Sequence, residues 1–176
     1  PYSVDDIRHK VSSVIHSRQL ERNNVLMTAR LEQSERLHRF MVESSPDIIY
    51  TLDRTGCFTY VNGRVESILG YTREELIGSP YFTIVHDDDR DRAIYAFNEK
   101  RTDHRATTNL EIRLKCKKGG AHRIFEDRKV VTMLSSVGMY ESAPESAEGI
   151  GQTRRYLGTY GVARDITERK LAEETI

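Results

Sequence analysis

The hydrophobic positions of this chain follow a helical period near its beginning and a strand period over much of the remainder. Ile7, Val11 and Val14 are spaced by four and three residues, which places them on one face of a helix. Pro46 ends this pattern, because proline cannot continue a helix and restricts the residue before it. The sequence therefore predicts one long N-terminal helix over about residues 3–43.

The apolar spacing of this helix changes phase after Arg18 and then follows a heptad. Polar residues interrupt the new seam at Asn24, Ser34 and His38, while Arg and Glu occupy most flanking positions. The pattern predicts a dimeric coiled coil and leaves its parallel or antiparallel orientation open, although a solvated helix lying on its own domain would have the same composition. The residues expected to form the dimer helix are Leu20, Met27, Leu31 and Met41.

A β-hairpin is predicted directly after the helix. Ile48 and Tyr50 begin an alternation that Phe58 and Tyr60 resume after a turn at residues 54–56. The same reading of the later chain predicts short helices at 65–70 and 72–78, a longer helix at 87–101, strands at 107–116, 122–134 and 156–167, and a long loop at 135–155. A hairpin, a helical crossover and three further strands make an α+β domain with one antiparallel sheet.

Two polar side chains are expected to cap helices of this domain. Thr72 and Glu75 have the spacing of a capping box, in which each side chain binds a backbone N–H near the other. Asn62 follows a strand and precedes a helix, so we expect its side chain to cap that helix rather than to bind a ligand.

Composition narrows the classes of function. The chain has 27 Lys and Arg against 27 Asp and Glu, so no net charge draws it to nucleic acid or to a membrane surface. No apolar run approaches the roughly 20 residues that span a bilayer. Cys57 and Cys116 lack CxxC spacing, which is typical of reduced thiols in a cytoplasmic protein. We therefore expect a cytoplasmic protein without nucleic-acid or membrane partners.

Four stretches of the sequence carry a resemblance to a known family. They read SPDIIYTLDRTGCFTYVN, ILGYTREELIG, IVHDDDR and GTYGVARDITERKLAEE, and the resemblance covers roughly residues 44–171. In this combination and order the chain resembles a PAS domain of the sensory-box type. The resemblance implies an α+β fold with a five-stranded antiparallel sheet in the order 2-1-5-4-3 and helices on one face. It also implies that Cys57 and Cys116 lie at opposite edges of the sheet and do not pair.

The resemblance offers two cofactors, and the residues argue against both. The flavin-photosensing subgroup carries a cysteine where this chain reads GSPYFTIVH, without one. The haem-sensing subgroup carries a histidine within the long helix, where this chain has Ala93 and Ile94, with His104 only at the far end. We expect no cofactor, although an unidentified small ligand stays open. Its candidate pocket residues, for which an ordinary core position is the favoured interpretation, are Phe82, Ile94, Phe97, Leu110 and Ile112.

His86 and the three aspartates that follow it are side chains of the kind that bind metals. Consecutive residues rarely converge on one ion, and the resemblance makes this stretch the acidic start of a helix. No pairing of a nucleophile with a base and no phosphate-binding glycine loop is present. We expect no metal and no catalytic residues. The alternative is a small-molecule-binding or metal-assisted enzyme on the same fold that uses His86 and its neighbouring carboxylates.

The last strand runs into a charged helix, and this junction is the expected signal-coupling site. A carboxylate and a hydroxyl here can cap the helix while they bind the sheet. The resemblance implies that the junction transmits changes in the sheet to a following effector, a histidine kinase or a cyclic-dinucleotide enzyme. The residues assigned to this role are Asp165, Ile166, Thr167, Glu168 and Arg169.

The opening stretch PYSVDDIRHKVSSVI resembles the last helix of a response-regulator receiver domain. The resemblance divides the chain into a receiver helix remnant at 1–18, a coiled-coil linker at 19–43, a PAS domain at 44–167 and the start of a signalling helix at 168–176. It implies an upstream receiver domain and a downstream effector in the same chain. We therefore expect the sensory and dimerisation module of a bacterial-type two-component protein.

Overall fold

The computed structural model describes residues 3–117, 129–141 and 154–174 and divides the chain into two compact units. The first unit is Pro1–Val42 and the second is Glu43–Ile176. In the described part of the chain, no helix has the length and apolar character of a membrane span.

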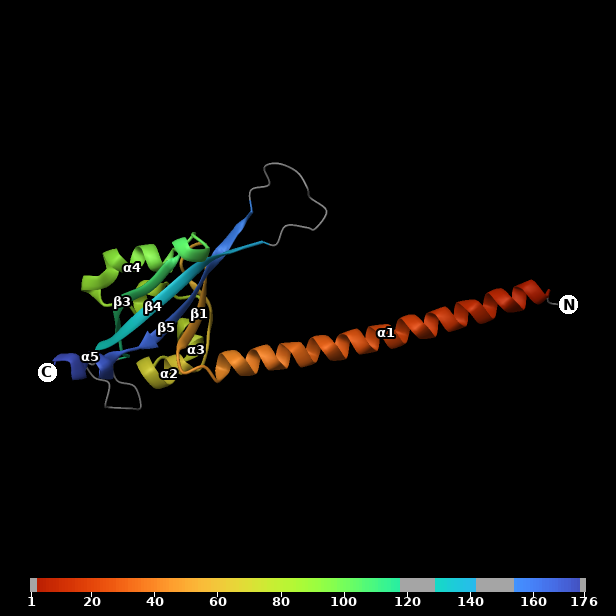
Figure 1. Ribbon diagram of the computed structural model, residues 1–176, viewed down its shortest axis with the longest axis horizontal. Helices are drawn as coiled ribbons and strands as arrows, with labels where there is room; N and C mark the ends of the chain where they lie inside the picture. The colour runs from red at the N-terminus through yellow and green to blue at the C-terminus, as the bar shows by residue number, and fades with distance from the viewer. Residues whose placement is uncertain (1–2, 118–128, 142–153, 175–176) are drawn as a thin grey trace. The chain divides into compact units, whose positions relative to one another are not determined.

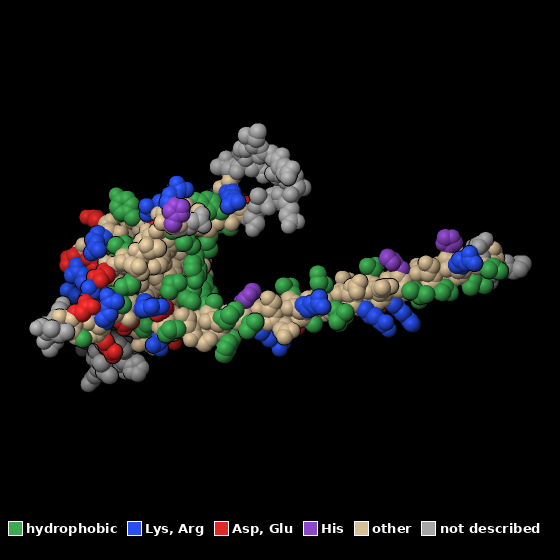
Figure 2. Space-filling model, viewed as in Figure 1, with side chains coloured by type: hydrophobic (Ala, Val, Ile, Leu, Met, Phe, Trp, Pro, Cys, Tyr) green, Lys and Arg blue, Asp and Glu red, His purple; other side chains and the backbone are tan. Residues whose placement is uncertain are grey.

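The first unit consists of helix α1 (Val4–Glu43), which is continuous over 40 residues (Figure 1). Its last residue, Glu43, already belongs to the globular unit. An ion pair between Arg39 and Glu35, at 2.9 Å, joins successive turns. Hydrophobic side chains lie exposed at intervals along the helix (Figure 2). The predicted long N-terminal helix is confirmed.

The second unit is built on an antiparallel sheet whose strands are β1 (Ile48–Asp53), β2 (Phe58–Val61), β3 (Thr107–Lys115), β4 (Lys129–Tyr140) and β5 (Tyr156–Asp165). The strand order is β2-β1-β5-β4-β3 (Figure 1). The N-terminal strand β1 thus pairs with the C-terminal strand β5, from Ile48 opposite Ala163 to Asp53 opposite Gly158. The predicted order 2-1-5-4-3 is confirmed. Cys57 and Cys116 stand beside β2 and β3, at opposite edges, and form no disulfide with each other.

The helices that complete this unit are α2 (Arg64–Leu69), α3 (Arg73–Leu76), the 3₁₀ helices η1 (Tyr81–Thr83), η2 (Asp87–Asp89) and η3 (Asp103–Arg105), α4 (Arg90–Phe97) and α5 (Thr167–Glu174). Inward-facing side chains of the strands, among them Tyr50, Leu52 and Leu134, share one buried core with side chains of α2, α3 and α4. The capping box of Thr72 and Glu75 is present at α3, as predicted.

An aromatic stack lies at the centre of this core. The rings of Tyr50, Phe97 and Tyr81 follow one another, with centroid separations of 5.3 and 4.8 Å. The ring of Tyr50 crosses β5 at Gly161, where an added Cβ would lie 2.2 Å from it, so this packing needs a glycine there. The Tyr50 hydroxyl is buried and has no hydrogen-bond partner among the described residues.

Three local predictions are wrong. The helix predicted at 87–101 ends at Phe97, because the backbone after it binds the sheet: Thr159 Oγ1 donates to the Glu99 carbonyl at 3.1 Å and the Gly138 N–H donates to that of Arg101 at 2.9 Å. The loop predicted at 135–155 begins too early, since β4 continues to Tyr140 by pairing with β5. Residues 142–153 of that loop, and 122–128 of the strand predicted before it, lie outside the described residues.

The third wrong prediction concerns Asn62, which does not cap α2. Its Oδ1 accepts the Ile49 N–H at 3.1 Å, and its Nδ2 donates to the Asp47 carbonyl at 3.0 Å. The N-cap position of α2 is occupied by Gly63, without a side-chain cap. Asn62 is fully buried and therefore holds the start of β1 in place.

Candidate functional site

The junction between β5 and α5 is tied to the neighbouring strand β4. The Ile166 N–H donates to the Val131 carbonyl at 2.9 Å, and the Val131 N–H donates to Thr167 Oγ1 at 3.0 Å. Asp165 Oδ1 accepts the Thr167 N–H at 2.9 Å and so caps the start of the helix. Ile166 and Thr167 are buried. The side chains of Asp165 and Thr167 thus both hold the junction in place through hydrogen bonds.

The first turns of α5 carry two further ion pairs. Arg169 is exposed and pairs with Glu173 on the same helix at 3.1 Å. Lys170 binds Glu111 of β3 at 2.8 Å, and this hydrogen bond raises the pKa of Lys170. Glu168 is exposed. Lys170, which was not among the residues assigned from the sequence, is therefore the side chain that ties α5 to an edge strand.

The segment that follows α1 meets the end of β5 through an ion pair. Arg164 Nη2 binds Asp47 Oδ2 at 3.0 Å, and Arg164 Nε lies 3.2 Å from both carboxylate oxygens. The Asp47 side chain is 12% exposed, whereas that of Arg164 is 67% exposed. The hydrogen bonds and charge of Asp47 raise the pKa of Arg164. This pair joins two segments that are 117 residues apart in the sequence.

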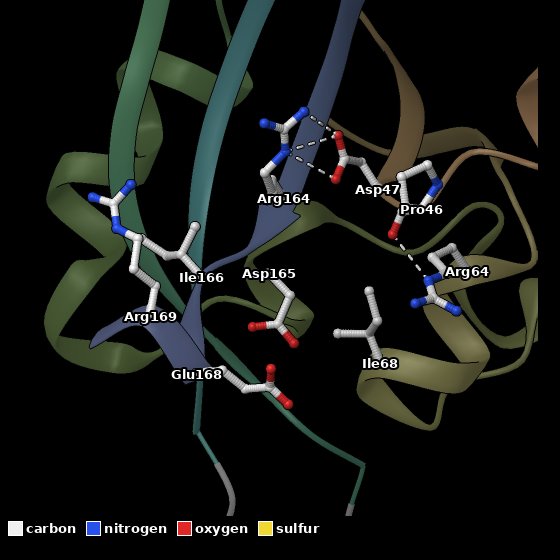
Figure 3. Close-up of a pocket in the computed structure, with 9 residues that line it drawn as sticks. All are labelled: Pro46, Asp47, Arg64, Ile68, Arg164, Asp165, Ile166, Glu168 and Arg169. Carbon is white, nitrogen blue, oxygen red and sulfur yellow. Dashed lines mark hydrogen bonds and ion pairs between the residues drawn. The ribbon is translucent and has the colours of Figure 1, made fainter. Parts of the chain in front are cut away.

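A groove of about 590 Å³ lies at this junction (Figure 3). Its apolar lining includes Ile68 of α2 and Ile166, and Arg64 donates its Nε to the Pro46 carbonyl at 2.9 Å. In Figure 3 the carboxylates of Asp165 and Glu168 point toward one another. The complete lining is Pro46, Asp47, Arg64, Ile68, Arg164, Asp165, Ile166, Glu168 and Arg169. All five residues assigned to signal coupling lie at this groove or, for Thr167, between two of its lining residues.

Glu43, the first residue of the globular unit, is also held by a charged cluster. Its carboxylate binds Arg73 of α3 through two nitrogens at 2.9 and 2.6 Å and accepts the Gly63 N–H at 3.1 Å. The Tyr60 hydroxyl donates to it at 2.9 Å. Burial raises the pKa of Glu43, but these hydrogen bonds and the Arg73 charge outweigh it, so the pKa lies below its usual value. Within the globular unit, Glu43 is therefore bound to α3, to β2 and to the residue before α2.

The candidate pocket residues divide between the core and the surface. Phe97 and Ile112 are each 1% exposed and belong to the core, and Leu110 packs against it. Phe82 and Ile94 are each 48% exposed and lie on the surface. Phe97, Ile112 and Leu110 thus contribute to the core, whereas Phe82 and Ile94 do not, and a ligand pocket at these residues stays a prediction.

The acidic side chains of residues 87–89 form ion pairs with arginine and lysine side chains of the same chain. Asp89, which is buried, accepts from Arg113 Nε at 2.9 Å and from the Arg113 N–H at 2.8 Å, and these hydrogen bonds hold the pKa of Asp89 at about 2. Asp87 pairs with Arg90 at 2.8 Å and with Lys115 at 3.3 Å. Nδ1 of His86 accepts the Asp88 N–H at 3.4 Å. These contacts join the start of α4 to β3.

The four dimer-helix residues all lie on α1 and are at least half exposed in the single chain. Their exposed fractions are 51% for Leu20, 68% for Met27, 70% for Leu31 and 53% for Met41. Their role in dimerisation stays a prediction.

Sequence reasoning missed two ion pairs: Asp47 with Arg164, which joins the two ends of the globular unit, and Glu43 with Arg73 of α3. One local signal pointed to Asp47, since a carboxylate after Ser45-Pro46 falls where the chain leaves a helix for a strand. Arg164 occupies an outward-facing strand position, where a charged residue is ordinary. Only the pairing of β1 with β5 brings it to Asp47.

Comparison with known proteins finds a family model, relatives and solved structures that are similar to this chain. A family model described as the PAS fold matches residues 58–136. The chain is 37% identical over 51 residues to the signal transduction histidine-protein kinase AtoS of Escherichia coli, which covers 29% of this chain and 8% of that protein. It is 27% identical over 100 residues to the probable diguanylate cyclase DgcE of Escherichia coli, covering 56% of this chain and 9% of that protein.

A third relative, protein y4lL of Sinorhizobium fredii, is 27% identical over 148 residues, which cover 84% of this chain and 16% of that protein. The chain thus spans less than a fifth of each of these three relatives.

Two solved structures show the same fold. A PAS domain from Colwellia psychrerythraea superposes with a TM-score of 0.56 at 23% identity, over 79% of this chain and 98% of that one. The PAS domain of an HTR-like protein from Haloarcula marismortui gives a TM-score of 0.55 at 19% identity, over 80% and 98%. With the strand order β2-β1-β5-β4-β3 and the family match at 58–136, they show that the globular unit of this chain has the PAS fold.

Proposed function

We propose that this PAS domain is a signal-relay and dimerisation module, which dimerises through α1 and transmits a change in α1 to α5. The observation that carries the proposal is the ion pair between Asp47 and Arg164, which joins the segment after α1 to the strand before α5. Because the Asp47 carboxylate is buried, a shift of the incoming segment either moves Arg164 with it or leaves a buried charge unpaired. The second outcome is unfavourable, so the two segments move together.

The outgoing helix has the contacts that such a relay needs. Hydrogen bonds of Ile166 and Thr167 to Val131, with the ion pair of Lys170 to Glu111, define one placement of α5 on the sheet. A signal acts by changing the balance between this placement and a second one in which these bonds are released. The relay is thus a shift in population between two positions of a helix.

The input and the output lie outside this unit. We assign the input to an upstream receiver domain or to an unidentified small ligand. The likeness to a histidine kinase and a diguanylate cyclase supports an effector of one of these two classes downstream in the same chain. The unit itself is assigned no catalytic step: the ion pairs of Asp87 and Asp89 with β3 support a structural role for the stretch that begins at His86.

Amide hydrogen exchange of the 176-residue chain tests the relay. Asp47→Asn removes the charge on the incoming side, and we expect the Ile166 and Lys170 amides to exchange about tenfold faster, the effect of a local loss of about 1.4 kcal/mol. Asp87→Asn is the matched control, because it removes an aspartate that pairs with Lys115 elsewhere on the sheet. Unchanged exchange at Ile166 and Lys170 in Asp47→Asn would overturn the relay.

The coupling is also expected in the reverse direction, because an energetic coupling between two sites is reciprocal. Thr167→Val removes the hydroxyl that accepts the Val131 N–H. We expect faster exchange of the Ile49 amide, which is bound to Asn62 on the incoming side. An effect confined to Val131 and α5 would show a local loss without transmission.

A further inference from the structure

We infer that α1 pairs with α1 of a second copy as a parallel, in-register coiled coil over residues 16–42. The inference rests on the proposed dimerisation and adds the orientation and register that the apolar pattern alone leaves open. It concerns α1 by itself and is independent of the relay through Asp47.

The seam of this coil runs through four exposed apolar residues, Leu20, Met27, Leu31 and Met41, while the exposed Val25, Leu26 and Phe40 lie outside it. Residues 20, 27, 34 and 41 form one row with a spacing of seven, and residues 24, 31 and 38 form a second. Each residue of the second row comes four residues after one member of the first row and three residues before the next. This spacing makes the first row the d positions and the second the a positions of a heptad. Leu20, Met27, Leu31 and Met41 are 51–70% exposed in the single chain, so a second helix along this seam would bury them.

The positions that flank the seam are complementary when the two helices run parallel. In that orientation a g residue lies beside the e residue five positions later on the other helix. The g row is His16, Asn23, Arg30 and Leu37, and the e row is Glu21, Thr28, Glu35 and Val42. The resulting pairs are imidazole with carboxylate, amide with hydroxyl, guanidinium with carboxylate, and apolar with apolar. All four pairs match, and none joins like charges.

Antiparallel pairing loses this agreement, because e residues then face e residues and g residues face g residues. The alignment that sets Leu31 opposite Met27 places Glu21 near Glu35 and Arg30 near its own copy, which are like-charge contacts. The alignment shifted by one heptad leaves Arg30 beside Leu37, so its charge meets no carboxylate in the flanking rows. Charge complementarity therefore favours the parallel orientation.

The polar seam residues favour the same register. Asn24 occupies an a position, where asparagine specifies register and oligomeric state at a cost in stability. In a parallel, in-register pair, Asn24 faces Asn24 of the second copy, so each side-chain amide has a hydrogen-bond partner. His38 likewise faces His38 of the second copy. A shift by one heptad would bury Asn24 against Leu31 without one. The coil ends at Val42, one residue before Glu43, so in a parallel pair the globular units of both copies follow the same end of the coil.

Disulfide formation in the 176-residue chain tests the orientation. Leu20→Cys is expected to cross-link with itself under mild oxidation, because the parallel register puts the two residues opposite each other. Ala29→Cys, on the outer face of the same helix, and the wild-type chain with Cys57 and Cys116 are the controls and should stay uncrosslinked. An equimolar mixture of Leu20→Cys and His38→Cys should give no mixed disulfide, whereas the antiparallel alignment with Leu31 opposite Met27 would place these two residues opposite each other.

The dimer dissociation constant, measured by sedimentation, gives a second readout that does not depend on cysteines. Arg30→Glu turns two attractive contacts with Glu35 into repulsive ones and should weaken the dimer about tenfold. Adding Glu35→Arg should restore most of the affinity. Arg36→Glu, the same substitution on the outer face, is the matched control and should have little effect.

The outcomes separate this inference from the proposed function. Mixed disulfides between positions 20 and 38, or a dimer that Arg30→Glu does not weaken, would overturn the parallel register and leave dimerisation in place. A wild-type chain that stays monomeric at all accessible concentrations would overturn the dimerisation as well. Neither result would bear on the hydrogen-exchange test of the relay.

Discussion

The ion pair between Asp47 and Arg164 predicts an unequal response to loss of either partner. The buried partner is the carboxylate, with 12% of its side chain exposed, while 67% of the Arg164 side chain is in solvent. Arg164→Met leaves a buried charge without its cation. Asp47→Asn leaves an exposed guanidinium that water solvates. We therefore expect removal of the exposed residue to destabilise the fold more than removal of the buried one.

The expected sizes follow from burial. Breaking a buried pair by removing one partner costs 3–5 kcal/mol, and the adjoining groove gives Asp47 some contact with water, so about 3 kcal/mol is expected for Arg164→Met. Asp47→Asn loses charge-assisted hydrogen bonds and leaves no buried charge, which costs about 1–2 kcal/mol. In the double variant no charge is buried unpaired. It should therefore be more stable than Arg164→Met alone, by about 1–2 kcal/mol.

Urea unfolding at pH 7, followed by circular dichroism, measures these free energies in a double-mutant cycle. Arg169→Met is the matched control, because it removes an arginine of the same groove whose partner Glu173 is exposed, and should change stability by less than about 0.5 kcal/mol. The reasoning fails if Arg164→Met proves no more costly than Asp47→Asn. It also fails if the second substitution lowers the stability of Arg164→Met further.

Two further predictions concern the interior. Burial raises the pKa of Glu99, but hydrogen bonds from Arg101 and Thr107 outweigh it and hold the pKa at about 2. This carboxylate stabilises the fold by about 3 kcal/mol at neutral pH and loses that contribution as pH falls from about 4.5 to 2. The free energy of unfolding of Glu99→Gln should therefore be lower than that of the wild type at pH 7, and the difference should shrink at pH 3. A difference that does not change with pH would contradict the assignment. Tyr50→Phe removes a buried hydroxyl without a partner among the described residues, so thermal unfolding should show equal or greater stability, and a loss above about 1 kcal/mol would reveal a partner for it.

Features that depend on neighbouring residues were predicted well from the sequence. The capping box at Thr72 and Glu75 and the stop of α2 at Gly70, whose φ is 79°, are encoded within a few residues of one another. Asp165 and Thr167 bind where a carboxylate and a hydroxyl at a strand end were expected to bind. Such features need only the local backbone, so pattern and propensity suffice for them.

Features that depend on pairing between distant segments were missed. The low apolar content of 135–140 indicated a loop, yet these residues continue β4 because β5 supplies their hydrogen bonds. Gly138 within this stretch lies so close to the backbone of Lys100 that a side chain would not fit there. Asn62 looked like a helix cap, but tertiary structure places it where the buried start of β1 needs both a donor and an acceptor. Single-chain patterns carry no information on which polar groups will be buried together.

The sequence by itself determined the long helix, the antiparallel sheet with its helical crossover, and the polar junction that leads into α5, because hydrophobic period and capping chemistry are written in consecutive residues. Only the tertiary structure decided that the segment after α1 and the end of β5 meet. Their contact exists because β1 and β5 are neighbours in the sheet, which brings Asp47 to Arg164 across 117 residues of chain. The Arg164 guanidinium compensates the buried Asp47 carboxylate, so the strand order places these two segments in direct contact.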